Sequence, residues 1–146
     1  MAMDCYGKPW HRAKHDRLGG RLLRVGFSGL GKMGKLVVEH LLRAGFPLTV
    51  HNRSRGVVDE LATPAEVAAQ SDAILTCLPD VPAVEKVFLG PSGIFEACRD
   101  GHLLIDHRTV GPDTSRTLYE RAQATKADVL DAPVSGGSTG AQAAPA

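Results

Sequence analysis

Short apolar runs alternate with candidate helical segments along most of the chain. The apolar runs lie at residues 22–27, 47–51, 73–78, 103–106 and 129–131. Candidate helices, with apolar residues recurring every three or four positions, lie at residues 33–44, 64–70, 81–88 and 112–126. The run at 73–78 is almost uniformly apolar, which is typical of strands covered on both faces. Strands that alternate with helices predict an α/β fold with a doubly wound, mostly parallel sheet.

The first 21 residues lack this periodicity. They are rich in Gly, Lys, Arg and His, and Gly19-Gly20 closes the segment just before the first apolar run. We therefore expect a disordered leader over residues 1–21 and a single folded domain over residues 22–146. A mitochondrial leader is the alternative, although two acidic residues and the absence of serine depart from the usual composition of such leaders.

Composition and charge narrow the class of protein. The 146 residues, 43% of them apolar, suffice for one domain with a hydrophobic core. Seventeen basic and sixteen acidic residues leave a formal charge of +1, so no overall field attracts nucleic acid or an anionic membrane. Cys5, Cys77 and Cys98 match no disulfide or zinc pattern, and no apolar run approaches the roughly 20 residues of a membrane span. We expect a cytoplasmic protein with no nucleic-acid, membrane or metal partner.

A glycine-rich loop directly follows the first predicted strand and opens the first predicted helix. Its residues are Gly29-Leu30-Gly31-Lys32-Met33-Gly34, a GxGxxG pattern. In such a loop the first glycine allows a tight turn, the second lets the backbone approach a pyrophosphate, and the third allows close packing of helix and strand. The pattern in this position predicts a Rossmann-type dinucleotide site, with an ordinary glycine-rich turn as the alternative. A phosphate-binding P-loop is excluded because the chain has no GxxxxGK[ST].

The residues that end the second predicted strand indicate which dinucleotide is preferred. A carboxylate at this position would bind the adenosine ribose 2′-hydroxyl of NAD. The chain instead reads His51-Asn52-Arg53-Ser54-Arg55. Guanidinium groups suit the 2′-phosphate of NADP, so NADP is predicted in preference to NAD. The alternative is that Arg53 and Arg55 are solvated loop charges.

Four blocks of sequence together resemble the β-hydroxyacid dehydrogenases, which include 3-hydroxyisobutyrate, tartronate semialdehyde and 6-phosphogluconate dehydrogenases. The blocks are residues 26–34, Asn52-Arg53-Ser54, Leu78-Pro79-Asp80, and Asp131-Ala132-Pro133-Val134-Ser135-Gly136-Gly137. The resemblance extends from about Arg24 to the C-terminus. It implies an NADP-binding domain of an oxidoreductase that transfers hydride between NADP and a small hydroxyacid.

The resemblance also implies roles for particular residues. Leu78 and Pro79 would line the cofactor, Thr109 would approach the nicotinamide side, and Ser135, Gly136 and Gly137 would bind the substrate carboxylate. The same segments follow predicted strands, so they should gather at the carboxyl edge of the sheet, where open α/β sheets bind ligands. On composition alone, residues 135–137 have the alternative of a polar tail.

The chain departs from the family where the chemistry is concentrated. The family uses a lysine general acid and base on a helix beyond the substrate loop, and a helical second domain that closes the site. The chain has neither, and its lysines lie outside that context: Lys8, Lys14, Lys32, Lys35, Lys86 and Lys126. We therefore predict no catalytic residue in this chain, little turnover alone, and a dimer or a partner supplying the missing domain. The alternatives are a non-enzymatic dinucleotide-binding or scaffold module, or a degenerate fragment.

Further departures concern the rim of the expected site. Between Arg55 and Pro64 the chain is several residues shorter than the family pattern. We therefore expect a brief helix after the second strand and leave open whether the family's third strand is present. Arg108 stands where the family usually has Ser, and it is expected either to pair with an anionic substrate or to crowd the nicotinamide. His107 is of a residue type suited to acid–base work but has no role in the family pattern. Cys77 is expected to be a buried apolar residue, and Cys98 an ordinary thiol unless Arg99 activates it.

Overall fold

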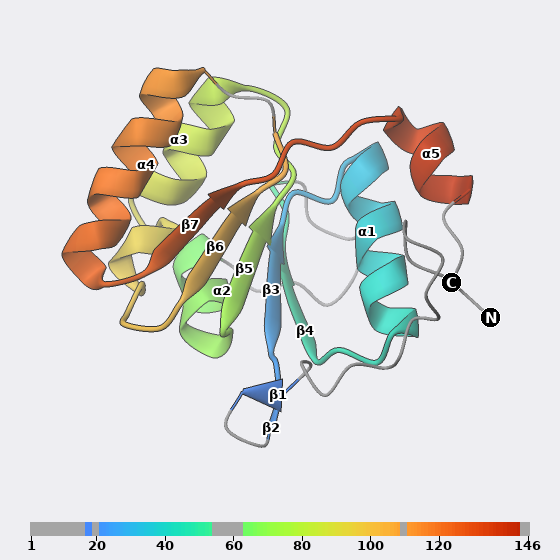
Figure 1. Ribbon diagram of the computed structural model, residues 1–146, viewed down its shortest axis with the longest axis horizontal. Helices are drawn as coiled ribbons and strands as arrows, with labels where there is room; N and C mark the ends of the chain where they lie inside the picture. The colour runs from blue at the N-terminus through green and yellow to red at the C-terminus, as the bar shows by residue number, and fades with distance from the viewer. Residues whose placement is uncertain (1–16, 19–20, 54–62, 109–110, 144–146) are drawn as a thin grey trace, which may run out of the picture.

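Five parallel strands form the centre of the protein, with helices on both faces (Figure 1). The computed structural model describes residues 17–18, 21–53, 63–108 and 111–143. The strands of the sheet are β3 (Val25–Ser28), β4 (Leu48–His51), β5 (Ala73–Thr76), β6 (Leu103–Asp106) and β7 (Asp128–Asp131). The helices are α1 (Lys32–Arg43), α2 (Pro64–Gln70), α3 (Val81–Leu89), α4 (Pro112–Thr125) and α5 (Gly137–Ala143), with a 3₁₀ turn, η1, at Ile94–Glu96. The predicted Rossmann-type α/β fold is confirmed.

The order of the strands places a switch in the middle of the sheet. The spatial order is β4-β3-β5-β6-β7, so the chain first moves from β3 to β4 and then returns to the other side of β3 to form β5. Gly26 of β3 pairs in register with Thr49 of β4 and Ile74 of β5. The loops that leave β3 and β5 therefore diverge from neighbouring strands. In doubly wound sheets such a divergence opens a crevice at the carboxyl edge.

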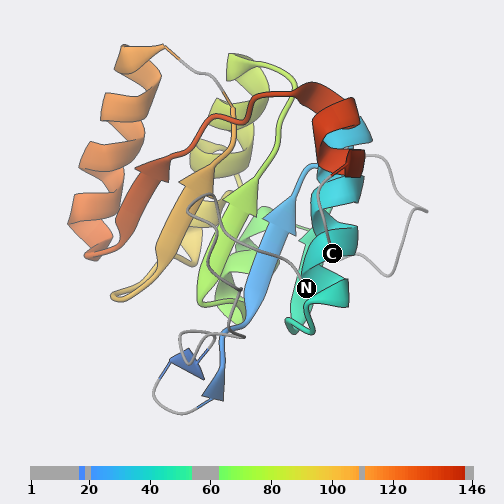
Figure 2. The ribbon, with the colours of Figure 1, turned by 45° about the vertical axis from the view of Figure 1, so that its right-hand side comes forward.

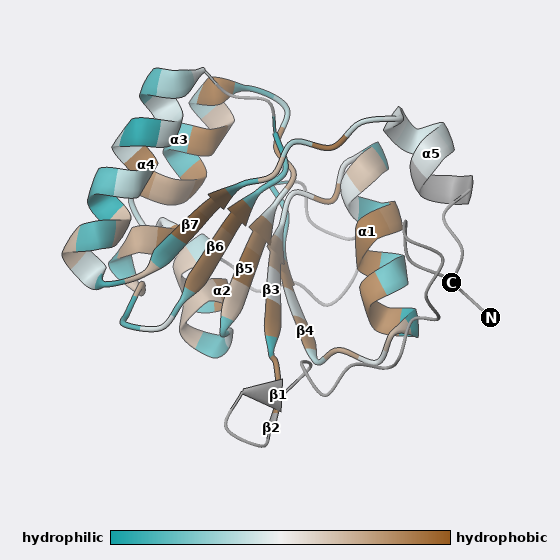
Figure 3. Cartoon of the chain, in the orientation of Figure 1, coloured by the Kyte–Doolittle hydropathy of each residue, from teal (hydrophilic) through white to brown (hydrophobic). Residues whose placement is uncertain are grey.

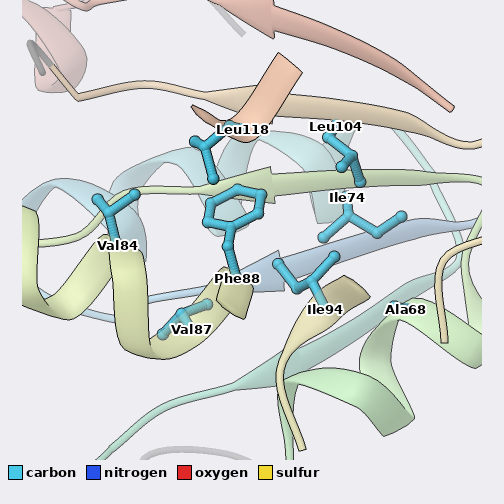
Figure 4. Packing of buried hydrophobic residues seen from close by; sticks show 8 residues of the cluster. All are labelled: Ala68, Ile74, Val84, Val87, Phe88, Ile94, Leu104 and Leu118. Carbon is cyan, nitrogen blue, oxygen red and sulfur yellow. The ribbon is translucent and has the colours of Figure 1, made fainter. Parts of the chain in front are cut away.

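The two faces of the sheet have separate hydrophobic cores. On one face α1 packs over β3 and β4, with Phe27, Val38 and Val50 buried. On the other face α2, η1, α3 and α4 cover β5 and β6 around Phe88, which is 1% exposed (Figure 4). The central strands are accordingly hydrophobic, while the outer surface of α4 is polar (Figure 3). Burial on both faces explains the continuous apolar runs in the sequence.

Helix α2 packs directly on the backbone of β3. A Cβ placed on Gly26 would lie 2.6 Å from Cγ1 of Val67, so only glycine allows this approach. The helix begins at a capping box, in which Oγ1 of Thr63 accepts from the Glu66 amide and the Glu66 carboxylate accepts from the Thr63 amide. These contacts fix the start of a helix of only seven residues.

Most predicted boundaries agree with the structure, and the clearest differences are at two strands. The first strand was expected from Leu22, but β3 begins at Val25, because the Arg24 amide donates to the Asp72 carboxylate instead of to a neighbouring strand. The third was expected to reach Leu78, but β5 ends at Thr76. Gly45 follows α1 at a φ of +84°, a left-handed conformation typical of the residue after a helix. Helix α5 and η1 were not predicted.

The ends of the sheet and the predicted leader are only partly described. Residues 1–16, 19–20 and 54–62 lie outside the described residues, which leaves the disordered-leader prediction and most of the shortened segment untested. Near the leader's end, β1 (Arg17–Leu18) pairs antiparallel with β2 (Arg21–Leu22). Among the described residues no strand lies between β4 and β5, so β4 is an edge of the sheet there. Within the same residues, no helix combines the length and apolar character that crossing a membrane requires.

Candidate functional site

A cleft of about 1050 Å³ lies at the carboxyl edge of the sheet, between the loops that leave β3 and β5. Its position coincides with the switch in strand order. The cleft is bounded by the glycine-rich loop, the end of β4, the loop after β5 and one face of α3. Its lining includes Gly29, Leu30, Gly31, Lys32, Met33, Gly34, Asn52, Arg53, Leu78 and Pro79. All ten were predicted to bind the cofactor, and the structure brings them together.

The three glycines of the loop have different surroundings. Gly29 has a φ of +105° and packs against the Cys77 carbonyl, and Gly34 packs against the Gly29 carbonyl. A Cβ on Gly31, in contrast, would have nothing within 4 Å. Gly31 is also the N-cap of α1, and having no side chain it leaves the first amides of the helix uncapped. The loop therefore presents uncapped N–H groups and the positive end of a helix dipole towards open space, an arrangement that suits an anion.

Residues at the end of β4 accept hydrogen bonds from the glycine-rich loop. The Gly29 amide donates to the His51 carbonyl at 3.0 Å, and the Leu30 amide donates to Oδ1 of Asn52 at 3.1 Å. Nδ1 of His51 lies 2.9 Å from Oγ of Ser28. Asn52 thus orients the loop through its side chain, while the exposed Arg53 follows at the mouth of the cleft. Ser54, predicted to share this role, lies outside the described residues.

The wall opposite the glycine-rich loop is formed by the segment after β5 and by α3. Asp80 caps α3, because its Oδ1 accepts from the Ala83 amide at 2.8 Å. Arg108, which follows β6, donates from Nη1 to the Leu78 carbonyl at 3.2 Å and also to the Pro79 carbonyl. Its side chain therefore pairs with backbone carbonyls, a contact that neither hypothesis from the sequence included. The other predicted residue of this region, Thr109, lies outside the described residues.

A buried carboxyl group lies at the end of β6, two residues before Arg108. Asp106, 2% exposed, accepts from Oγ1 of Thr76 at 2.7 Å. Burial raises the pKa of Asp106, and the hydrogen bond from Thr76 opposes that shift only in part. His107 turns its Nδ1 to the Ala132 carbonyl at 3.1 Å, and its Nε2 is buried without a partner among the described residues. The geometry therefore ties His107 to the backbone after β7 and does not direct it into the cleft.

The predicted substrate residues lie at the same edge of the sheet but outside the cleft lining. The segment after β7 is held to β6 by the Ala132 amide, which donates to the Asp106 carbonyl at 2.9 Å. Ser135, Gly136 and Gly137 are exposed, and α5 begins at Gly137. Figure 2 shows this segment crossing above the sheet and α5 lying beside α1. The substrate residues therefore share an edge with the cleft without contributing to its described walls.

Several lining residues carried no clear signal in the sequence. His51 ends β4, as predicted for the second strand, and it also lines the cleft. Lys86 and Val87 on α3 also line it, and only their helical spacing from the Leu78-Pro79 block could have indicated this.

Cys77, expected to be buried in a strand, lies after β5 and is partly exposed at the cleft. Burial raises the pKa of Cys77 and of Cys98, so the structure does not support an activated Cys98 thiol. Among the described residues, no three His, Cys, Asp or Glu side chains cluster as metal ligands.

Comparison with known proteins agrees with this geometry. A family profile described as the NAD binding domain of 6-phosphogluconate dehydrogenase matches residues 24–146. The mitochondrial 3-hydroxyisobutyrate dehydrogenase of Mus musculus is 37% identical over 121 residues, which are 77% of this chain and 36% of that protein.

Two solved structures share the fold. Psf3 in complex with NADP+ and 2-OPP is 30% identical with a TM-score of 0.75, over 80% of this chain and 44% of that chain. The 3-hydroxyisobutyrate dehydrogenase of Mycobacterium tuberculosis, with L-serine, is 27% identical with a TM-score of 0.73, over 82% and 43%. The chain thus spans about two fifths of the length of these relatives. It belongs to the 6-phosphogluconate dehydrogenase family of NAD-binding domains, as its resemblance to the β-hydroxyacid dehydrogenases implied.

Proposed function

We propose that the chain binds NADP in the cleft, in preference to NAD, as the cofactor domain of a β-hydroxyacid dehydrogenase. The observation that carries the proposal is the open space above Gly31, at the uncapped start of α1. Packing requires glycine at positions 29 and 34, but nothing in the fold requires it at position 31. A glycine that packing does not require, at the N-terminus of a helix and inside a cleft, supports the proposal that a phosphate approaches the backbone there.

The binding mode follows from the two ends of the cleft. The pyrophosphate would lie against the amides at the start of α1, between Gly31 and Gly34. The adenosine end would lie towards the end of β4, where Asn52, Arg53 and Ser54 follow the strand and the Arg53 guanidinium would hold the 2′-phosphate. The nicotinamide end would then extend past Leu78 and Pro79, and we keep Thr109 as a proposed contact on its nicotinamide side. The NADP+ held by Psf3 supports this choice of cofactor.

Substrate binding is proposed for the segment after β7. Ser135 offers a hydroxyl, and Gly136 and Gly137 offer exposed backbone amides, which together suit the carboxylate of a small hydroxyacid. The bound cofactor would accept or supply the hydride, and this chain would bind and orient it. Lys32 and Lys86 line the cleft, but neither stands in the family's catalytic position. We therefore propose that a group outside these 146 residues, on a domain of the kind that the family carries, performs the acid–base step.

The first experiment is calorimetric titration of the purified chain with NADPH and, separately, with NADH. We expect NADPH to bind at least tenfold more tightly, which is the order of one charge-assisted contact to a phosphate. Equal or tighter binding of NADH would overturn the preference for NADP. Absence of binding to either would overturn the proposed function and favour a degenerate domain.

Catalysis and location need separate tests. A scaffold module that binds the cofactor would show no turnover of hydroxyacids even in a protein that carries the helical domain, whereas the proposed function predicts turnover there. The cytoplasmic location remains a prediction, and fractionation of the source cells would decide between cytoplasm and mitochondria.

A further inference from the structure

Arg108 connects the ends of two neighbouring strands. Its backbone amide lies 3.4 Å from Oδ1 of Asp106, the buried carboxyl at the end of β6. Its Nη1 reaches across to the carbonyls of Leu78 and Pro79, which follow β5. The side chain is partly buried, and its Nε is enclosed. The guanidinium therefore occupies a fixed position between the two loops.

The segment that Arg108 holds has few other restraints from neighbouring strands. Strand β5 ends at Thr76, and the last backbone bond linking this stretch to β3 is from the Cys77 amide to the Ser28 carbonyl, at 3.0 Å. Pro79 has no amide hydrogen, and regular structure resumes only at α3, capped by Asp80. The hydrogen bonds from the Arg108 guanidinium to two carbonyls thus restrain the segment between the end of β5 and the start of α3.

We propose that Arg108 is a positioning residue that fixes the Leu78-Pro79 wall of the cleft for the nicotinamide half of the dinucleotide. The inference rests on the proposed function. Arg53 and the Leu78-Pro79 wall lie at the ends of β4 and β5, on opposite sides of β3, so one dinucleotide that spans the cleft meets them with different halves. Arg108 acts through the wall and need not touch the ligand. A wall held in its bound position spares the ligand the entropic cost of ordering it.

The test compares Arg108→Ala and Arg108→Lys with the unsubstituted chain. The matched control is Arg116→Ala on α4, where the removed guanidinium is exposed and lies 3.5 Å from Asp113. Each protein is titrated with NADPH and with adenosine 2′,5′-bisphosphate, which represents the adenosine half alone. Amide hydrogen exchange over residues 77–83 is measured in the ligand-free proteins, and melting temperatures check the fold.

We expect Arg108→Ala to weaken NADPH binding about three- to tenfold, the order of the cost of ordering one or two residues on binding. Its binding of adenosine 2′,5′-bisphosphate should stay within twofold, and exchange over residues 77–83 should become faster. Arg108→Lys should recover part of the affinity, because an ammonium can donate to one of the carbonyls. Arg116→Ala should change nothing.

Unchanged exchange over residues 77–83 in Arg108→Ala would overturn the inference whether or not the cofactor binds. An equal loss for NADPH and for adenosine 2′,5′-bisphosphate would also overturn it, since this would indicate a general loss of structure. If the unsubstituted chain bound no NADPH, the proposed function would fail and the role in binding would fail with it. Faster exchange in Arg108→Ala would then still establish the restraint on the loop.

Discussion

Gly34 faces the carbonyl oxygen of Gly29 so closely that a Cβ on Gly34 would overlap this oxygen. The contact brings the first turn of α1 against the turn that leaves β3. Gly31 lies between them in the sequence and has open space in front of it. The same motif therefore contains two glycines that packing requires and one that it does not, and single substitutions can separate the two roles.

The first prediction concerns stability. Gly34→Ala should lower the free energy of unfolding by about 2 kcal/mol or more, because the backbone of Gly29 cannot move away without disturbing the turn. Gly31→Ala should cost less than about 1 kcal/mol, since only the N-cap preference of α1 is affected. Urea unfolding followed by circular dichroism measures both. Equal losses in the two variants would contradict a packing role for Gly34 that Gly31 does not share.

The second prediction concerns the effect of Gly31→Ala on cofactor binding. Gly31→Ala should weaken NADPH binding by more than about tenfold, because its methyl group would occupy the space through which a pyrophosphate approaches the amides of α1. The measurement is calorimetric titration of Gly31→Ala, with its melting temperature as the check that it remains folded. Unchanged affinity in a folded variant would place the pyrophosphate elsewhere in the cleft.

The fold could be predicted because its signals are local. Apolar runs and helical spacing locate the five parallel strands and four of the helices, and buried faces on both sides of the sheet explain why the runs are continuous. Errors occur where a distant group takes a backbone bond, as when Asp72 receives the Arg24 amide and β3 begins later than expected. Helix α5 was missed because its Gly- and Ser-rich sequence has no hydrophobic period.

The candidate site was predictable only where one motif carries the chemistry. The glycine-rich loop was identified from its pattern and Leu78-Pro79 from the family resemblance, and the structure brings them together in one cleft. The contact between Arg108 and the Leu78 carbonyl joins residues 30 positions apart and has no local pattern. The face that α3 presents to the cleft likewise depends on how that helix packs. Tertiary contacts of this kind cannot be read from one sequence.

The third prediction tests the cofactor preference. Arg53→Ser should weaken NADPH binding at least tenfold, because a contact between a guanidinium and a phosphate contributes about 1.5–3 kcal/mol. NADH binding should remain within twofold. The control is Arg43→Ser at the C-terminal end of α1, where the exposed arginine pairs with Glu39. Unchanged NADPH binding in Arg53→Ser would identify Arg53 as a solvated loop charge, and equal losses for both nucleotides would assign it a structural role.

The fourth prediction concerns pH and the buried His102. This side chain is 2% exposed, accepts from the Arg99 amide through Nδ1 at 3.4 Å, and has no described partner at Nε2. Burial and, next, the positive charge of Arg99 lower the pKa of His102. The unfolded chain therefore binds a proton more readily than the folded chain. Stability from the neutral imidazole is present above the unfolded-state pKa of about 6.5 and is lost as the pH falls from there towards the lowered pKa.

His102→Asn should remove this dependence, because the asparagine oxygen can still accept from the Arg99 amide but does not titrate. Between pH 7.5 and 5.5 the unsubstituted chain should lose more stability than the variant, by at most about 1.4 kcal/mol per pH unit for one proton. Urea unfolding at both pH values gives the difference. The raised pKa of Asp106 acts in the opposite direction and is common to both proteins, so it cancels in the comparison. Parallel pH profiles would show that His102 takes up its proton without opposing the fold.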